Sequence, residues 1–222
     1  MDPSRLADVM LEKRSWPLYR LGHWVVGAAL WLLGRWEVHG LENVPNDGPV
    51  ILAPNHTSYL DPPAVGTAMR RPIWFMAKSE LFENLILGPL IWRMRAFPVR
   101  RGRPDRRALR NCLRLLEAGE VVTVFPEGER SKTGQLQEPE LGVAVLALRS
   151  GAPVVPVAMS GTDEVLPRHA VLPRFGKVVV RFGEPMTFPE YRGKKASKDD
   201  LREVADRIMR EIARLLREPI QP

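Results

Sequence analysis

The sequence predicts an α/β fold with a mostly parallel central sheet flanked by helices, preceded by a pair of amino-terminal helices within residues 1–34. Short apolar runs typical of buried strands alternate with stretches of helical pattern, and this alternation favours a parallel sheet covered on both faces. The chain has 222 residues, a length that suits one sizeable α/β domain better than two. We therefore expect a single domain over residues 35–222.

The expected strands follow from short apolar runs bounded by polar or turn residues. The run Val121–Val124 is of the fully buried type, and Val50–Pro54 is equally apolar. Residues 41–48 separate the first two runs and are expected to form a loop. The sequence thus predicts strands at residues 36–40, 50–54, 73–77, 121–125, 154–159 and 177–182.

The expected helices are marked by the residues at their ends and by their periodicity. Pro104 and Asp105 are typical of a helix start, and Gly119 ends the helix that they open. Gly151 likewise ends a helix that we expect to begin at Pro139. Two more helices are expected near residues 64–69 and at 83–93. The last helix, residues 199–217, is amphipathic, with one apolar side formed by Leu201, Val204, Ile208, Ile212 and Leu215.

A histidine and an aspartate stand five positions apart directly after the apolar run at residues 50–54: His56 and Asp61. Ligands of open α/β sheets bind at the carboxyl ends of strands. An imidazole can accept a proton near neutral pH, and a carboxylate bonded to its other nitrogen fixes the tautomer and stabilises the imidazolium. The neighbouring hydroxyls of Thr57 and Ser58 do not sit in a G-x-S-x-G turn. The pattern predicts a His–Asp base that activates a substrate hydroxyl without a covalent enzyme intermediate.

The same residues also fit a purely structural interpretation. Asp61 precedes Pro62 and Pro63, and aspartate before proline is a common helix N-cap. His56 would then be a buried histidine whose hydrogen bonds serve only the fold. A second polar block, residues 125–131, favours the catalytic interpretation, because it too directly follows an apolar strand-like run.

Four blocks of the chain resemble the 1-acylglycerol-3-phosphate acyltransferases, a family of glycerolipid acyltransferases. The family's N-H-x-S-x-x-D block, which contains its HX4D motif, corresponds to residues 55–61. Its F-P-E-G-x-R-S block corresponds to residues 125–131, with Glu129 where threonine is usual. Residues 96–101 look like the intervening basic block, and residues 154–157 like the apolar fourth block. The resemblance covers residues 36–185, with the blocks in the family's order and spacing.

The resemblance implies a membrane-associated enzyme of phospholipid biosynthesis that moves a fatty acyl group from an acyl thioester to the hydroxyl of lysophosphatidic acid, giving phosphatidic acid. The catalytic residues would be His56 and Asp61. The residues expected to bind the acceptor are Arg100, Arg101, Glu127, Gly128, Arg130 and Ser131. Arginine forks match phosphate oxygens, so we expect the phosphate at Arg101 and Arg130. Glu127 is expected to orient Arg130 or to accept a bond from a glycerol hydroxyl.

Other functions stay open at this point. The acceptor could be glycerol-3-phosphate or another lyso-lipid, a thioesterase would use the same base on water, and a non-catalytic lipid-binding protein would need no base. The donor would be acyl-CoA or acyl carrier protein, and no further cofactor is expected. One departure from the family concerns the phosphate: residues 139–142 lack the lysine that often precedes the glycine opening the next helix. The extra arginines would then supply the charge.

The net charge of +7 indicates an anionic partner, either nucleic acid or lipid. No nucleic-acid module signature is present, and Phe97 is the one aromatic residue within the basic run. We therefore expect an anionic membrane surface as partner and no nucleic acid. The positive charge is concentrated in a short stretch that contains Arg93, Arg95, Arg100, Arg101, Arg103, Arg106, Arg107 and Arg110.

The amino-terminal segment supports this expectation. Residues 21–34 carry no formal charge, but they are fewer than the ~20 needed to cross a bilayer, and they lack the cleavage pattern of a secretory signal. Trp24 and Trp31 favour the headgroup boundary, and the flanking Arg20 and Arg35 can reach lipid phosphates. We expect residues 1–34 to form a monotopic, interfacial helix pair on the cytoplasmic face of the cell membrane. The alternative is a core helix packed on the domain.

Cysteine and histidine are scarce in this chain. Cys112 is the single cysteine, which excludes an internal disulfide and a cysteine-rich metal site. Its place in a helical apolar pattern indicates a core position. The four histidines show no metal-ligand spacing, so the sequence predicts no metal site.

Overall fold

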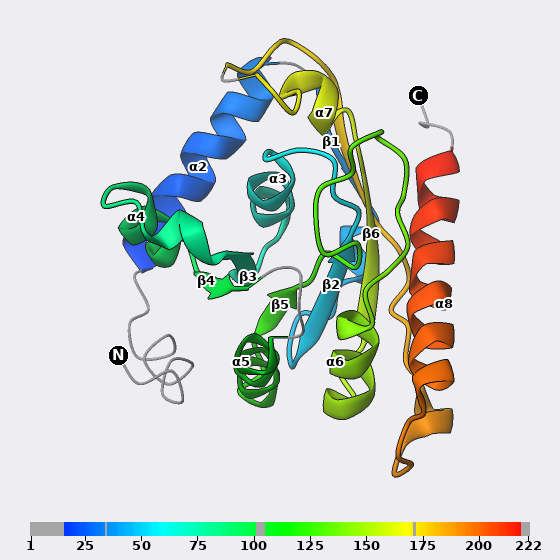
Figure 1. The fold of residues 1–222 in the computed structure, drawn as a ribbon. Helices are drawn as coiled ribbons and strands as arrows, with labels where there is room; N and C mark the ends of the chain where they lie inside the picture. Colours follow the sequence, from blue (N-terminus) through cyan, green and yellow to red (C-terminus); the bar gives the residue numbers. More distant parts are fainter. Residues whose placement is uncertain (1–15, 34, 101–104, 171, 219–222) are drawn as a thin grey trace.

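The computed structural model describes residues 16–33, 35–100, 105–170 and 172–218, and these form a seven-stranded sheet between two layers of helices (Figure 1). The strand order across the sheet is β1-β7-β6-β2-β5-β3-β4. All neighbouring strands pair in parallel except β6 and β7, which are antiparallel. The strands are β1 (Trp36–His39), β2 (Val50–Pro54), β3 (Ile73–Lys78), β4 (Ala96–Val99), β5 (Val121–Thr123), β6 (Val154–Ser160) and β7 (Val178–Phe182). The predicted fold class is confirmed.

The helices cover both faces of the sheet (Figure 1). One face carries α5, α6 and α8; the other carries α2 and α3, with α4 beside them at the β4 edge. The helices are α2 (Trp16–Leu33), α3 (Asp61–Ala68), α4 (Leu87–Arg93), α5 (Arg106–Glu117), α6 (Gly142–Ser150), α7 (Thr162–Val165) and α8 (Lys198–Arg217), with short 3-10 helices η2 (Leu41–Asn43), η3 (Ser79–Phe82) and η4 (Pro189–Tyr191).

The central strand β2 explains why its sequence is apolar throughout. Successive side chains of a strand point to opposite faces, so Ile51 enters the core beneath α5, α6 and α8, whereas Leu52 enters the core beneath α2 and α3. Both side chains are fully buried. A strand covered on both faces lacks the polar alternation of a half-exposed strand, as the sequence indicated for this run.

Two predicted helices begin later than expected. The predicted helix at 83–93 is wrong in its first turn, because α4 begins at Leu87. The Asn84 side chain accepts hydrogen bonds from the N–H groups of Ile86 and Leu87, and Pro89 requires an early helical position. Similarly, α6 begins at Gly142 instead of 139. The N–H of Glu140 donates to the carbonyl of Pro126 at 2.8 Å, which ties the preceding residues to the second polar block.

Strand β4 and helix α7 were not among the predicted elements. β4 has four apolar residues, but the run is short, contains Pro98 and borders the basic stretch, so the sequence did not mark it as a strand. Its position at the sheet edge is one where a strand tolerates proline. The prediction for α5 is confirmed, and Asp105 caps it by accepting from the N–H groups of Arg107 and Ala108. Pro104 lies outside the described residues.

Helix α2 is longer than the predicted segment and packs on α3. Tyr19 and Leu30 are buried on its inner side, and the N–H of Ile73 donates to the Tyr19 hydroxyl at 3.3 Å. The first helix of the predicted pair falls within residues 1–15, outside the described residues. Among the helices that are described, none combines the length and apolar character that a bilayer crossing requires.

Candidate active site

The site lies at the carboxyl ends of three central strands of the sheet, β6, β2 and β5, which are neighbours in the strand order. Each of these strands leads into a polar segment. Asn55, directly after β2, fixes the first segment to β6: its side-chain oxygen accepts from the N–H of Met159 at 2.7 Å, and its amide donates to the Met159 carbonyl at 3.0 Å. The backbone that carries His56 therefore leaves the sheet in a defined direction.

His56 and Asp61 contact each other as the sequence predicted. The distance from His56 Nδ1 to Asp61 Oδ2 is 2.8 Å, and both side chains are buried. The same carboxylate oxygen accepts from the N–H groups of Thr57 and Ser58, each at 2.7 Å. These two bonds hold the carboxylate in line with the imidazole.

The helix-cap alternative for Asp61 is not what the structure shows. Leu60 occupies the N-cap position of α3, and no side chain caps that end. Asp61 is the first helical residue, and its carboxylate bonds backward to the loop that precedes it, not to the N–H groups of the helix. Its hydrogen bonds therefore serve the loop and the imidazole.

The hydrogen bond to Asp61 also assigns the tautomer of His56. A neutral imidazole that donates from Nδ1 carries its lone pair on Nε2. The ring stacks on Phe125, with ring centroids 4.1 Å apart and planes inclined by 27°. The imidazole is thus oriented on one side by a carboxylate and on its face by an aromatic ring, an arrangement that presents Nε2 as a proton acceptor.

Glu127 positions the backbone of His56. Its Oε1 accepts from the His56 N–H at 2.8 Å, and its Oε2 accepts from the Gln137 N–H at 3.0 Å. Burial raises the pKa of the Glu127 carboxyl, and these backbone donors act in the opposite direction. This role differs from both roles expected for Glu127, the orientation of Arg130 and a bond from a glycerol hydroxyl.

The rest of the second block reinforces this contact. The N–H of Ser131 donates to the His56 carbonyl at 2.7 Å, so Glu127 and Ser131 hold the backbone on both sides of the His56 Cα. The Ser131 hydroxyl donates to the carbonyl of Gln135 at 2.6 Å. Gly128 has a φ of +70°, and a Cβ there would approach Glu140 Cγ to 2.9 Å. The turn therefore requires glycine. A substrate contact of Gly128 or Ser131 stays a prediction.

Arg130 lies over an aromatic ring that belongs to the first block. Its guanidinium carbon is 3.5 Å from the centroid of the Tyr59 ring, a cation–π contact that orients the planar fork. Arg168 donates from Nη1 to the carbonyls of Arg130 and Ser131 at 3.2 and 3.1 Å. Arg168 thus fixes the backbone that carries Arg130, and the Arg130 guanidinium is a group that favours binding of an anion.

Arg168 and Tyr59 were not among the predicted site residues. Arg168 follows the short helix α7 and belongs to none of the four blocks, so no sequence signal separated it from the other arginines. Tyr59 occupies a variable position inside the first block. Its ring orients the guanidinium of Arg130, a residue that is distant from Tyr59 in the sequence.

The structure leaves the two arginines of the basic block untested. Arg100 follows β4 at the sheet edge, its side chain is exposed, and its N–H donates to Asp105 Oδ2 at 3.0 Å. β3 and β5 separate its strand from β2. Arg101 lies outside the described residues. Phosphate binding by this pair stays a prediction.

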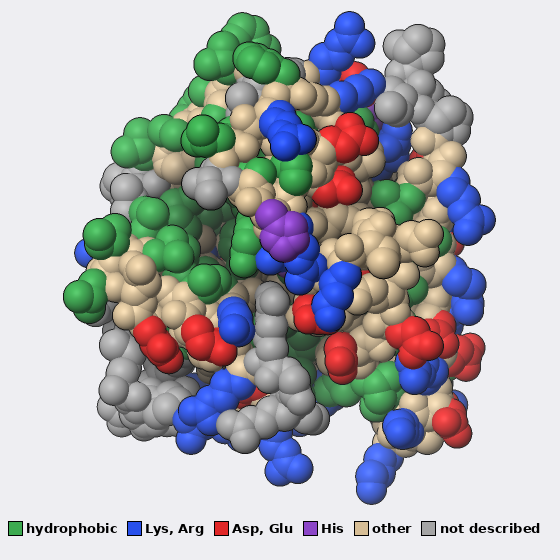
Figure 2. Space-filling model, turned by 45° about the horizontal axis from the view of Figure 1, so that its top comes forward, with side chains coloured by type: hydrophobic (Ala, Val, Ile, Leu, Met, Phe, Trp, Pro, Cys, Tyr) green, Lys and Arg blue, Asp and Glu red, His purple; other side chains and the backbone are tan. Residues whose placement is uncertain are grey.

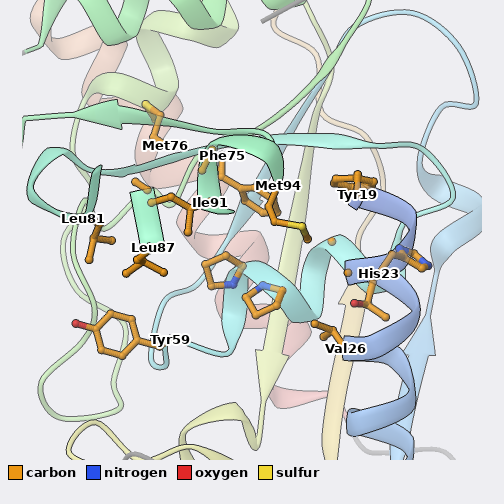
Figure 3. A pocket seen from close by; sticks show the side chains of 17 residues that line it. Tyr19, His23, Val26, Tyr59, Phe75, Met76, Leu81, Leu87, Ile91 and Met94 are labelled. Atoms are coloured by element: carbon orange, nitrogen blue, oxygen red, sulfur yellow. The ribbon is translucent and has the colours of Figure 1, made fainter. Parts of the chain in front are cut away.

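An apolar cavity of about 520 Å³ adjoins the first block. Tyr59 of that block and the two prolines directly after it, Pro62 and Pro63, contribute to its wall, and the other lining residues come mainly from α2, α3, β3 and α4. Figure 3 shows Val26 directed from α2 toward the cavity, with Leu87 and Ile91 on its other side. This cavity could not be predicted from the sequence, because its wall combines residues from separate elements.

Comparisons with known proteins identify relatives of this chain. A family model described as Acyltransferase matches residues 35–160. The 1-acyl-sn-glycerol-3-phosphate acyltransferase of Bacillus subtilis (strain 168) is 32% identical over 156 residues, which are 70% of this chain and 75% of that protein. The protein of that name from Streptococcus pneumoniae is 29% identical over 190 residues, 84% of this chain and 68% of its own.

A solved structure is also similar over most of the chain. The crystal structure of the 1-acyl-sn-glycerophosphate (LPA) acyltransferase PlsC from Thermotoga maritima superposes with a TM-score of 0.72 at 28% sequence identity. The similarity covers 92% of this chain and 80% of that one.

Proposed function

The chain belongs to the acyltransferase family, and from that premise we propose that it transfers a fatty acyl group from an acyl thioester to the free hydroxyl of 1-acylglycerol-3-phosphate, giving phosphatidic acid. The observation that carries the chemistry is the 2.8 Å contact between His56 Nδ1 and Asp61 Oδ2. It supplies a base of fixed tautomer, and Arg130 supplies an anion site next to the same loop through its contact with Tyr59. The donor is acyl-CoA or acyl carrier protein.

The reaction requires one proton acceptor that later becomes a donor. His56 Nε2 takes the proton of the acceptor hydroxyl as the oxygen attacks the thioester carbonyl. The tetrahedral intermediate then collapses, the carbon–sulfur bond breaks, and the imidazolium returns its proton to the departing thiolate. Asp61 stabilises the imidazolium between these steps. The acyl group passes directly to the lipid, so no covalent bond to the protein forms.

Arg130 binds the phosphate of the acceptor in this proposal. Arg130→Ala is expected to raise the acceptor KM by about 10–100-fold, because a charge-assisted hydrogen bond contributes roughly 1.5–3 kcal/mol. Arg130→Lys should restore only part of the loss, since it lacks the planar fork. Steady-state kinetics at saturating donor measure the acceptor KM of both variants. Arg149→Ala, at an exposed position near the end of α6, is the control. An unchanged acceptor KM and kcat in Arg130→Ala would remove phosphate binding from this residue.

The apolar cavity holds the acyl chain of the thioester in this proposal. Its volume lies within the ~300–1,000 Å³ typical of small-molecule sites, and Tyr59 of the His56–Asp61 loop forms part of its wall. Each buried methylene contributes about 0.8 kcal/mol. The cavity wall therefore sets how many methylenes the enzyme can use.

Filling the cavity should change the preference for chain length. Val26→Phe is expected to lower kcat/KM for long-chain donors by about tenfold relative to short-chain donors, equivalent to the loss of roughly two methylenes. A series of donors of increasing length measures the ratio. Val25→Phe is the matched control, because the neighbouring Val25 side chain is exposed on the outer side of α2. The same ratio in both variants would contradict the assignment.

The outer side of α2 supports attachment to a membrane. Trp24 and Trp31 are 71% and 76% exposed. Leu21, Val25 and Leu32 are exposed on the same side, at the spacing of one helical face. An apolar stripe rimmed by tryptophan is typical of a helix that lies in the headgroup boundary. We place this face on the cytoplasmic side of the cell membrane, as a peripheral or monotopic attachment.

A further inference from the structure

The exposed apolar surface extends beyond α2. Within the described residues, every exposed large hydrophobic side chain other than Tyr59 belongs to α2, to residues 85–90 or to residues 172–175. The most exposed members of the two additional segments are Leu85 (91%), Ile86 (84%), Leu172 (77%) and Phe175 (82%). Contiguous apolar surface of this kind marks an interaction site in a folded protein.

The three segments lie on one side of the molecule. Residues 85–90 lead into α4 beside the first turns of α2, whereas the loop with residues 172–175 lies near the last turns of α2 (Figure 1). Figure 2 shows hydrophobic side chains gathered over the α2 and α4 side, whereas charged side chains predominate on the α8 side. α2 and α4 also form walls of the cavity, so this surface lies on the side of the molecule that carries the cavity.

Both additional segments are held in place by hydrogen bonds. The Asn84 side chain accepts from the N–H groups of Ile86 and Leu87 at 3.0 and 2.8 Å, which fixes the turn that exposes Leu85 and Ile86. The N–H of Arg174 donates to the carbonyl of the buried Val165 at 2.7 Å, which fixes the loop with Leu172 and Phe175. The fold therefore presents these side chains to the outside in defined positions.

Charge next to these segments suits a lipid surface. Arg20 stands on α2, Arg93 follows residues 85–90, and Arg174 lies between Leu172 and Phe175. Arginine side chains at such positions can reach lipid phosphates while apolar neighbours enter the acyl region. Glu83 also precedes the turn, so the attachment depends chiefly on apolar side chains.

We propose that the turn at residues 85–86 and the loop at residues 172–175 enter the same lipid surface as α2, forming a three-point attachment on the side of the molecule that carries the cavity. The proposal rests on the proposed acylation of a lysophospholipid, whose acyl chain lies in a bilayer. Attachment at three points fixes the orientation of the enzyme on the bilayer, so that the acceptor hydroxyl meets His56 without extraction of the whole lipid into water.

Single-cysteine probes test where the protein meets the bilayer. Cys112 is buried and burial raises its pKa to about 12, so it does not compete for a thiol-reactive fluorophore. We expect a nitrobenzoxadiazole probe at Ile86→Cys, Phe175→Cys or Trp24→Cys to brighten severalfold on vesicles that contain phosphatidylglycerol, and to be quenched by lipids with brominated acyl chains. A probe at Arg202→Cys, exposed on α8, should show neither change.

Two double variants test the consequence for activity. Leu85→Ser/Ile86→Ser and Leu172→Ser/Phe175→Ser are each expected to lower vesicle binding about tenfold, because each removes two side chains from the apolar phase. Activity on vesicle-embedded acceptor should fall with binding, whereas activity on a water-soluble short-chain acceptor should stay within twofold. Arg202→Ser/Arg210→Ser is the control on the opposite side.

The outcomes separate this proposal from the proposed function. Unquenched probes at residues 86 and 175 on vesicles that bind the protein would overturn the three-point attachment. Probe signals that rise with protein concentration in the absence of vesicles would assign the surface to a second copy of the chain and also overturn it. If the proposed function were wrong, the wild-type protein would instead fail to acylate the soluble acceptor.

Discussion

Replacing His56 with alanine is expected to lower kcat for phosphatidic acid formation by about 10²–10⁴-fold, the range that a general base contributes. The fold should persist, because the Asp61 carboxylate keeps the N–H donors of Thr57 and Ser58. The backbone N–H and carbonyl of residue 56 also keep their bonds to Glu127 and Ser131. The initial rate at saturating donor and acceptor measures the loss, and circular dichroism monitors folding.

A matched histidine variant separates the base from general effects. His39→Ala removes an imidazole that lies near Glu37 on the edge strand β1. Strands β7 and β6 separate β1 from β2, so His39 lies outside the site. Its kcat is expected to stay within twofold of wild type. Turnover of His56→Ala within a few-fold of wild type would remove the base from the mechanism. Global unfolding of that variant would instead support a structural role for His56.

Replacing Asp61 is expected to damage both activity and stability, in proportions that depend on the substitution. Asp61→Ala leaves two N–H groups and the imidazole without their acceptor, and each unsatisfied buried group costs about 1–3 kcal/mol. The free energy of unfolding should therefore fall by roughly 2–5 kcal/mol. Turnover should also fall by orders of magnitude, because the imidazole loses the carboxylate that orients it.

The asparagine variant separates these two effects. Asp61→Asn retains an oxygen that can accept from Thr57 and Ser58, so most of the stability should return. The neutral amide does not stabilise an imidazolium, so kcat should stay about 10²–10⁴-fold below wild type. Denaturant unfolding and steady-state rates measure the two quantities independently. An Asp61→Asn protein with near wild-type turnover would show that Asp61 serves only the loop.

The sequence was informative where chemistry depends on local order along the chain. His56 and Asp61 could be assigned from their spacing and from the strand that precedes them, because a strand end places both in one short loop. The same reasoning identified the second block and the parallel sheet. The spacing of residues and the end of an apolar run are local properties of the chain, so they can be recognised in a single sequence.

The sequence was uninformative where a contact depends on the tertiary structure. Glu127 bonds to the His56 and Gln137 backbones, and no spacing rule relates these positions. Arg168 reaches the Arg130 and Ser131 carbonyls across the site, and the cavity combines walls from separate elements. The starts of α4 and α6 were also misplaced, because hydrogen bonds to the Asn84 side chain and to the Pro126 carbonyl outweigh local helix preference there.

The central claim is direct transfer of the acyl group from thioester to lipid hydroxyl with His56 as the base. The most direct measurement mixes the wild-type protein with radiolabelled acyl donor in a single turnover, with and without 1-acylglycerol-3-phosphate, and follows label in protein, free fatty acid and phosphatidic acid. We expect phosphatidic acid only when the acceptor is present, no labelled protein, and negligible fatty acid. Labelled protein formed without acceptor, or fatty acid released at the same rate without it, would exclude direct transfer.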